Sequence, residues 1–165
     1  MGLICELYRI DDATIDKIID DPKWGYDFIL LNYAEVGGSC HVENDTVFST
    51  DKAWAIADYL ISQYAISKGF EINVLGDKVE KDYSGSEGLR VIKSQEVNHV
   101  NELIKHIDTS TISEFYDRED TIRNNLYRAH WIEKVDHYVI SHVVTFKEAY
   151  SKAVSENNGL VVRIG

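Results

Sequence analysis

One apolar stretch, residues 51–64, constrains the fold of this chain more than any other part of the sequence. Its apolar side chains recur at steps of three and four residues, as on one face of an amphipathic helix: Ala53, Ile56, Ala57, Leu60, Ile61 and Tyr64. Thr50 or Asp51 can cap the first amides of this helix, and Lys68 with Gly69 provides a stop. A helix of about five turns with this much apolar surface has to be covered by other elements.

The length and composition indicate a single globular domain. The chain has 165 residues, enough for a sizeable core, and we expect one domain over residues 1–165. No apolar run is long enough to span a bilayer, and charged residues interrupt the N-terminal apolar stretch where a signal peptide would be uninterrupted. The two cysteines, Cys5 and Cys40, make no disulfide framework. These features predict a soluble, reduced, cytoplasmic protein.

The net charge is −11 and is unevenly distributed. Residues 1–50 hold ten acidic and three basic residues, so −7 falls in fewer than a third of the positions. Nucleic-acid binding needs a basic stripe that displaces counterions, and the sequence has none, which also disfavours an anionic membrane surface. The acidic third is either a solvated surface that maintains solubility or a face that steers a basic protein partner. We favour the first explanation, because charge alone identifies no partner.

Apolar segments at the two ends of the chain predict strands. Residues 3–10 are typical of a strand buried on both sides, and residues 160–164 of a closing strand. We expect these two strands to pair, since either one alone would expose a row of amides. Between them, residues 89–92 predict a short strand, and the glycine-rich residues 71–88 a loop that can hold a small hairpin.

Helices are predicted at several further places. A short helix follows Asp11 or Asp12 and ends at residues 20–22, with Ile15, Ile18 and Ile19 as its apolar stripe. Residues 26–36 are ambiguous between helix and strand, and we favour helix for 26–33; residues 37–46 form a polar loop. A later helix begins at Ser94 and has an apolar stripe of Val97, Val100, Ile104 and Ile107. Residues 110–128 predict one or two short helices whose inward side chains are Ile112, Phe115, Tyr116, Ile122 and Leu126. The last long helix spans residues 133–156.

Candidate catalytic and metal-ligating residues do not assemble into a site. Cys40 and His41 are adjacent, but a nucleophilic thiol needs a base that meets it in space, an orienting group and an oxyanion site. Glu96 and His99 have the Glu-x-x-His spacing of a di-iron site, yet no second such pair exists. His142 lies among apolar positions, which favours a hydrogen-bonded core histidine over a metal ligand. We therefore expect no catalytic residue, no metal site and no cofactor.

Several short segments resemble one family. They are Met1–Gly2 before a strand, Asp51–Trp54 with Tyr59 and Leu60, Leu75–Gly76, Leu89–Ile92 before Gln95–Val97, Tyr127 near Trp131, and Tyr150 followed by a strand after Gly159. On these residues the chain resembles the YfbM-like family of small bacterial proteins, a domain of unknown function. The resemblance spans nearly the whole chain, although only the Asp-Lys-Ala-Trp helix is specific. It implies an α+β fold whose small sheet includes the N- and C-terminal strands and is covered by about five or six helices. It implies no activity.

The sequence also departs from the family pattern. Where the family often has histidines directly after the tryptophan and four residues after it, this chain has Ala55 and Asp58. This helix therefore lacks the imidazole groups of the family, unless the Asp58 carboxyl group takes over their role. The family's Gly-Pro-Ala-Arg turn is altered to Gly88 and Leu89 before Arg90, and residues 34–48 match the family poorly.

Two classes of function fit the sequence. The one we favour is a protein-binding module without enzymatic activity, for example an antitoxin or immunity-type protein that neutralises a basic partner. The alternative is a small-molecule binder or enzyme with a pocket near the 51–58 helix, whose tentative binding residues are Asp51, Lys52, Trp54, Asp58 and Arg90. Taken singly, these residues also have structural explanations as a cap, a core aromatic and a surface ion pair. The sequence does not determine the oligomeric state.

Overall fold

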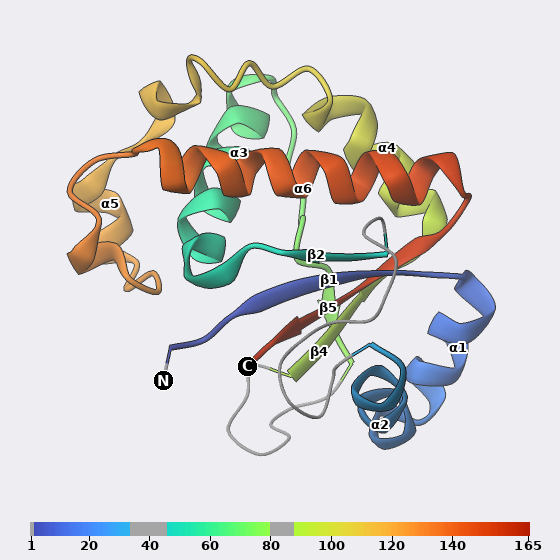
Figure 1. Cartoon of the computed structure of the whole chain (residues 1–165). Coiled ribbons are helices and arrows are strands. Elements are labelled where there is room, and N and C mark those ends of the chain that lie inside the picture. Colours follow the sequence, from blue (N-terminus) through green and yellow to red (C-terminus); the bar gives the residue numbers. More distant parts are fainter. Residues whose placement is uncertain (1, 34–45, 80–87) are drawn as a thin grey trace.

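The computed structural model describes residues 2–33, 46–79 and 88–165 (Figure 1). In chain order the strands are β1 (Cys5–Ile10), β2 (Val47–Ser49), β3 (Asp77–Lys78), β4 (Gly88–Ile92) and β5 (Gly159–Ile164). The α-helices are α1 (Asp12–Asp20), α2 (Pro22–Asn32), α3 (Trp54–Ser67), α4 (Ser94–Ile104), α5 (Arg118–Arg123) and α6 (His137–Ser155). Three 3-10 turns are η1 (Asp51–Ala53), η2 (Ile112–Phe115) and η3 (Ala129–Trp131). The fold is α+β, as predicted.

The strands form one antiparallel sheet in the order β2-β1-β5-β4-β3. The predicted pairing of the chain ends is confirmed, because β1 pairs with β5 from Cys5 opposite Ile164 to Ile10 opposite Gly159. The short strand β4 and its small hairpin with β3 also match the prediction. We predicted no strand at β2, because its three residues are too few for a periodic pattern. Residues 34–45 and 80–87, which include most of the predicted loops, lie outside the described residues.

Helices α3, α4 and α6 cover one face of the sheet (Figure 1). α3 is not the amphipathic helix we predicted: Ala55 and Tyr59 are buried as well as the predicted stripe, so the helix is enclosed on nearly every side. Its cap is also different, because neither Thr50 nor Asp51 caps it with a side chain. The Thr50 hydroxyl instead donates to the Cys5 carbonyl of β1 at 3.2 Å. The helix ends at Lys68 and Gly69 as expected.

Helices α1 and α2 cover the opposite face of the sheet (Figure 1). Asp11 caps α1, and Asp21 caps α2 by accepting a hydrogen bond from the Trp24 amide at 3.0 Å. The preference for helix over residues 26–33 is therefore confirmed. The prediction that Ile19 belongs to the buried stripe of α1 is wrong, since this side chain is exposed whereas Ile15 and Ile18 are buried.

The remaining helices follow the predicted pattern, with different ends. The predicted apolar stripe of α4 is buried, and residues 110–128 form the two short elements η2 and α5. The cap of α4 is not Ser94 itself: the Asp12 carboxylate of α1 accepts hydrogen bonds from the Ser94 amide at 2.8 Å and the Ser94 hydroxyl at 2.6 Å. α6 begins at His137, capped by Asp136, so Val135 precedes the helix. No helix within the described residues is long and apolar enough to cross a membrane.

Candidate functional site

The five residues proposed from the sequence fall into two neighbourhoods at α3. Asp58 and Arg90 lie between α3 and the sheet, within range of each other's charge. Asp51, Lys52 and Trp54 lie at the start of the helix, against aromatic side chains from the later part of the chain. The structure thus brings each subset together but does not join all five in one site. Whether either subset binds a ligand stays a prediction.

Asp58 is a carboxyl group held in an unfavourable environment. It is enclosed by the core on nearly all sides, although a small part of the residue reaches solvent. Burial raises the pKa of Asp58 to about 6, and the positive charge of Arg90 offsets only part of this rise. Within the described part of the chain, Asp58 and Arg90 do not approach closely enough to form an ion pair. This carboxyl can therefore exchange a proton near neutral pH.

Arg90 holds a turn in place while keeping unused donors. It extends from β4 toward the face covered by α3, and its Nη1 donates to the Gly76 carbonyl at 3.2 Å. Its buried Nε has no hydrogen-bond partner among the described residues. Gly76 has φ +74, a conformation that a residue with a side chain adopts only under strain. Arg90 therefore supports a left-handed turn next to the buried Val74 and Leu75.

The start of α3 carries a strained residue in an aromatic surround. Asp51 has φ +40, which is rare for a residue with a side chain, and its carboxylate accepts a hydrogen bond from the Tyr138 hydroxyl at 2.8 Å. The Trp54 ring stacks on Tyr127 with centroids 5.6 Å apart, and its buried Nε1 has no partner in the described chain. The Lys52 stem lies beside Gly2. Strain and unpaired polar atoms gather at functional sites, but they do not identify a ligand.

His142 differs from our expectation of a hydrogen-bonded core histidine. Both of its ring nitrogens are buried without a hydrogen-bond partner among the described residues. Its ring meets the Tyr138 ring edge-on, with centroids 4.7 Å apart. Burial lowers the pKa of His142, and the nearby negative charge of Asp51 acts in the opposite direction. The neutral imidazole is therefore favoured at this position.

No metal or thiol chemistry is assembled in residues 2–33, 46–79 and 88–165. Within them, no three or more His, Cys, Asp or Glu side chains gather in a way that could hold a metal ion. His99 is exposed on α4, and His106 is exposed just after the end of that helix. The Cys5 thiol is free and buried, and burial raises its pKa to about 12, so it stays protonated and unreactive. Cys40 and His41 lie outside the described residues.

The outer surface of α2 carries apolar side chains beside acidic ones. Trp24, Phe28 and Leu31 follow one another at steps of four and three residues, so they lie along one side of the helix. Trp24 stacks on Phe28 at 5.0 Å, and Leu31 is 84 % exposed. Exposed carboxylates of α1 and α2 and the turn between them lie nearby in sequence: Asp16, Asp20, Asp21 and Asp27. We call these side chains of α1 and α2 the α2 face.

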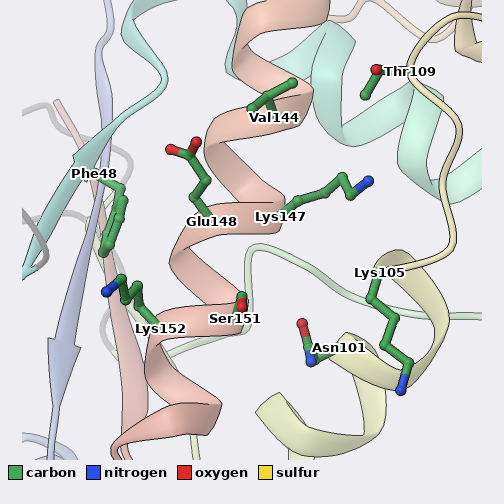
Figure 2. Close-up of a pocket in the computed structure, with 9 residues that line it drawn as sticks. All are labelled: Phe48, Asn101, Lys105, Thr109, Val144, Lys147, Glu148, Ser151 and Lys152. Atoms are coloured by element: carbon green, nitrogen blue, oxygen red, sulfur yellow. The ribbon is translucent and has the colours of Figure 1, made fainter.

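Sequence reasoning missed a groove on the outer side of α6 (Figure 2). Its volume is about 590 Å³, within the range of small-molecule sites. It is lined by Phe48, Asn101, Lys105, Thr109, Val144, Lys147, Glu148, Ser151 and Lys152. The only sequence signal was the lysine content of two separate helices, and the sequence does not say that those helices lie side by side. None of the five residues proposed from the sequence lines this groove.

The architecture and the comparisons together identify the class of protein. The fold is an α+β domain built on a five-stranded antiparallel sheet with both chain ends at its centre. The chain matches the family model "Domain of unknown function (DUF1877)" over residues 1–163, and it belongs to that family.

One solved structure supports the same relationship. It is that of YfbM from Escherichia coli, described as a protein of unknown function, and it matches with a TM-score of 0.60. The match covers 98 % of this chain and 99 % of that chain at 13 % sequence identity, so it shows a shared fold alone. The resemblance to YfbM-like proteins is thereby confirmed. No curated protein matches the chain.

Proposed function

We propose that this protein is a protein-binding module that docks a basic partner protein on the α2 face. The observation that carries the proposal is the line of Trp24, Phe28 and Leu31 along one side of α2, where Trp24 and Leu31 are exposed and Phe28 is partly buried against the small core cluster. Helices that bind protein grooves present apolar anchors at such spacings, and exposed tryptophan is enriched among the residues that dominate binding energy.

Electrostatics supports a basic partner. The two helices and the turn between them carry exposed Asp16, Asp20, Asp21 and Asp27, against only two lysines, Lys17 and Lys23. Acidic side chains on the same pair of helices accelerate the approach of a positively charged surface and disfavour acidic competitors. An antitoxin or immunity-type protein that neutralises a basic partner is a role of this kind. A cytosolic, reducing setting suits the free thiol of Cys5.

A co-purification experiment with paired variants tests the proposal. The wild type, Trp24→Ala/Leu31→Ala and Trp131→Ala are each used to capture proteins from the native host. Trp131 is 83 % exposed in η3, at the opposite end of the molecule from α2, so it is the matched control (Figure 1). We expect a basic protein to be retained by the wild type and by Trp131→Ala, and lost with the double variant.

Rate measurements then test the role of the charge. Reversal of Asp20 and Asp27 to lysine should slow association of the captured protein about tenfold or more at low salt, with less effect at high salt. Docking on the α2 face is refuted if the partner binds the double variant as tightly as it binds the wild type. It is also refuted if the charge reversal leaves the association rate unchanged.

A small-molecule binder at α3 is a second candidate. Two observations favour it: the unpaired Nε of Arg90 and the unpaired Nε1 of Trp54, both buried donors that a ligand could satisfy. Mass spectrometry of small molecules retained from a host extract tests this. The candidate predicts a compound held by the wild type and released by Arg90→Lys, and it fails if both proteins retain the same compounds.

A further inference from the structure

The groove on α6 is a second, independent feature, because it lies on the opposite side of the sheet from the α2 face. Figure 2 shows α4 and α6 side by side, with Asn101 and Lys105 on the first helix and Lys147 and Ser151 on the second. Thr109 approaches from the segment that follows α4. Phe48 of β2 completes the lining, so the polar groups of the groove come from two helices and one adjoining segment, which keeps them in fixed positions.

The groove places several lysines on an acidic protein, although carboxylates lie near them: Glu102 beside Lys105, and Asp108 within range of the Lys147 charge. Three lysines line it, although the whole chain has a net charge of −11. Lys147 Nζ donates to the Ile107 carbonyl at 2.7 Å, which positions the ammonium and leaves two of its three donors available. Lys105 Nζ pairs with the exposed Glu102 at 2.7 Å, an ion pair that is weak in water. Glu148 is the one acidic residue of the lining, and in Figure 2 its carboxylate points toward β2, away from Lys105 and Lys147.

Asn101 supplies an observation of a different kind. It is only 8 % exposed, and its buried Oδ1 has no hydrogen-bond partner among the described residues. In Figure 2 this oxygen points into the space between α4 and α6, on the side that faces Ser151. A buried acceptor without a donor destabilises the fold unless something satisfies it. A ligand hydroxyl or a bound water molecule in the groove would supply the missing donor.

We propose that this groove binds a small phosphate ester that carries free hydroxyl groups, such as a sugar phosphate. The phosphate lies at the ammonium group of Lys147, and the Lys105 side chain, which points away from Lys147 in Figure 2, turns toward the phosphate when the ligand binds. Both ammonium groups bind phosphate as point charges. A hydroxyl of the same ligand donates to Asn101 Oδ1, and the hydroxyls of Thr109 and Ser151 are available to further oxygens. The volume of about 590 Å³ fits a metabolite of this size.

Nuclear magnetic resonance titration of the full chain with defined probes tests the proposal. Glucose 6-phosphate should shift the amide signals of Asn101, Lys105 and Ser151, whereas glucose should not, because the phosphate provides most of the affinity. Inorganic phosphate should bind at least about tenfold more weakly, since it is too small to contact the lysines and Asn101 Oδ1 at the same time. Lys105→Gln and Lys147→Gln should each weaken glucose 6-phosphate binding about tenfold or more.

Two controls separate a specific site from general charge attraction. Lys134→Gln removes an exposed lysine outside the groove and should leave binding unchanged. Asn101→Ala should reduce the preference for glucose 6-phosphate over inorganic phosphate, with the thermal midpoint measured in parallel to confirm folding. Glucose 6-phosphate at about 10 mM would occupy even a site whose Kd is about 1 mM. The proposal is wrong if that concentration shifts no amide signal of the groove. It is equally wrong if inorganic phosphate binds as tightly, or if Lys134→Gln and Lys105→Gln weaken binding equally.

Discussion

The two faces of the sheet differ in what they do for the molecule. On the face covered by α3, α4 and α6, 30 buried residues of the described chain form one apolar cluster, whereas the face covered by α1 and α2 holds eight. The large face even encloses Asp58, at a cost visible in its raised pKa. The small face leaves Trp24 and Leu31 partly or largely in solvent.

This difference indicates a division of roles between the two faces. Apolar burial is the dominant favourable term in folding, so the large face supplies most of the stability. The α2 face can then present apolar and acidic side chains to a partner without weakening the core, because these groups contribute little to folding. The four predictions below test that division, from the largest expected change in stability to the smallest.

Removing the Trp54 side chain should damage the large face most. Trp54 is 9 % exposed and stacks on Tyr127, so Trp54→Ala should lower the free energy of unfolding by about 3–5 kcal/mol. Urea unfolding measures this loss of free energy. The matched comparison is Trp24→Ala on α2, and because Trp24 is partly exposed we expect a loss below about 1 kcal/mol. Equal losses would show that the two faces do not differ as described.

The large face should also become less stable as pH rises. The folded pKa of Asp58 is about 6 against an ordinary 3.8, so the folded state holds a proton that the unfolded state has already lost. Stability from this group is therefore greatest below about pH 4 and falls as pH rises through 6, by up to about 3 kcal/mol. Other carboxylates oppose this trend, so the informative quantity is the difference between the wild type and Asp58→Asn.

Urea unfolding at several pH values between 4 and 8 measures that difference. The wild type should lose stability relative to Asp58→Asn across this interval. The control is Asp20→Asn, at an exposed position without an ion pair among the described residues, and it should follow the wild type. Parallel curves for the wild type and Asp58→Asn would mean that burial does not raise the pKa of Asp58.

One carboxylate connects the two faces, and its loss should have an intermediate effect. Asp12 at the start of α1 caps α4 through Ser94, whereas Asp11 caps α1 locally through Thr14. Asp12→Ala and Asp11→Ala should each cost about 0.5–2 kcal/mol. Only Asp12→Ala should increase amide hydrogen exchange in the first turn of α4. Unchanged exchange there would show that the connection contributes nothing to α4.

The smallest effect is expected at the most exposed position of the α2 face. Leu31 is 84 % exposed, so Leu31→Ala should change the thermal midpoint by less than the equivalent of about 0.5 kcal/mol. Differential scanning calorimetry measures this. A large loss would mean that Leu31 supports the fold, and the α2 face would then be structural.

Local signals in the sequence predicted most of the fold. Periodic apolar positions located α1, α4 and α6, and short apolar segments at the chain ends located β1 and β5, because these patterns depend only on neighbours in the chain. The same reasoning misjudged α3, where Ala55 and Tyr59 are buried by elements whose positions the sequence does not disclose. It also missed the Asp12 cap of α4, since the two partners are 82 positions apart.

The candidate site was predictable only in part. The grouping of Asp51, Lys52 and Trp54 follows from their adjacency. No pattern in the sequence predicts that the charges of Asp58 and Arg90 act on each other. The contact of Asp51 with Tyr138 joins residues 87 positions apart, and the groove on α6 depends on two helices meeting. Such juxtapositions are properties of the folded chain, so a single sequence does not reveal them.

The central position of β5 has a consequence for biosynthesis. Arg163 of β5 binds Glu6 of β1, 157 positions earlier, and β5 also carries β4 on its other edge. While the ribosome is still making α6, β1 has no inner neighbour and the sheet cannot close. A polypeptide released before residue 159 would expose two strand edges side by side, which invites aggregation and degradation. The sheet can therefore form in full only after β5 has been synthesised.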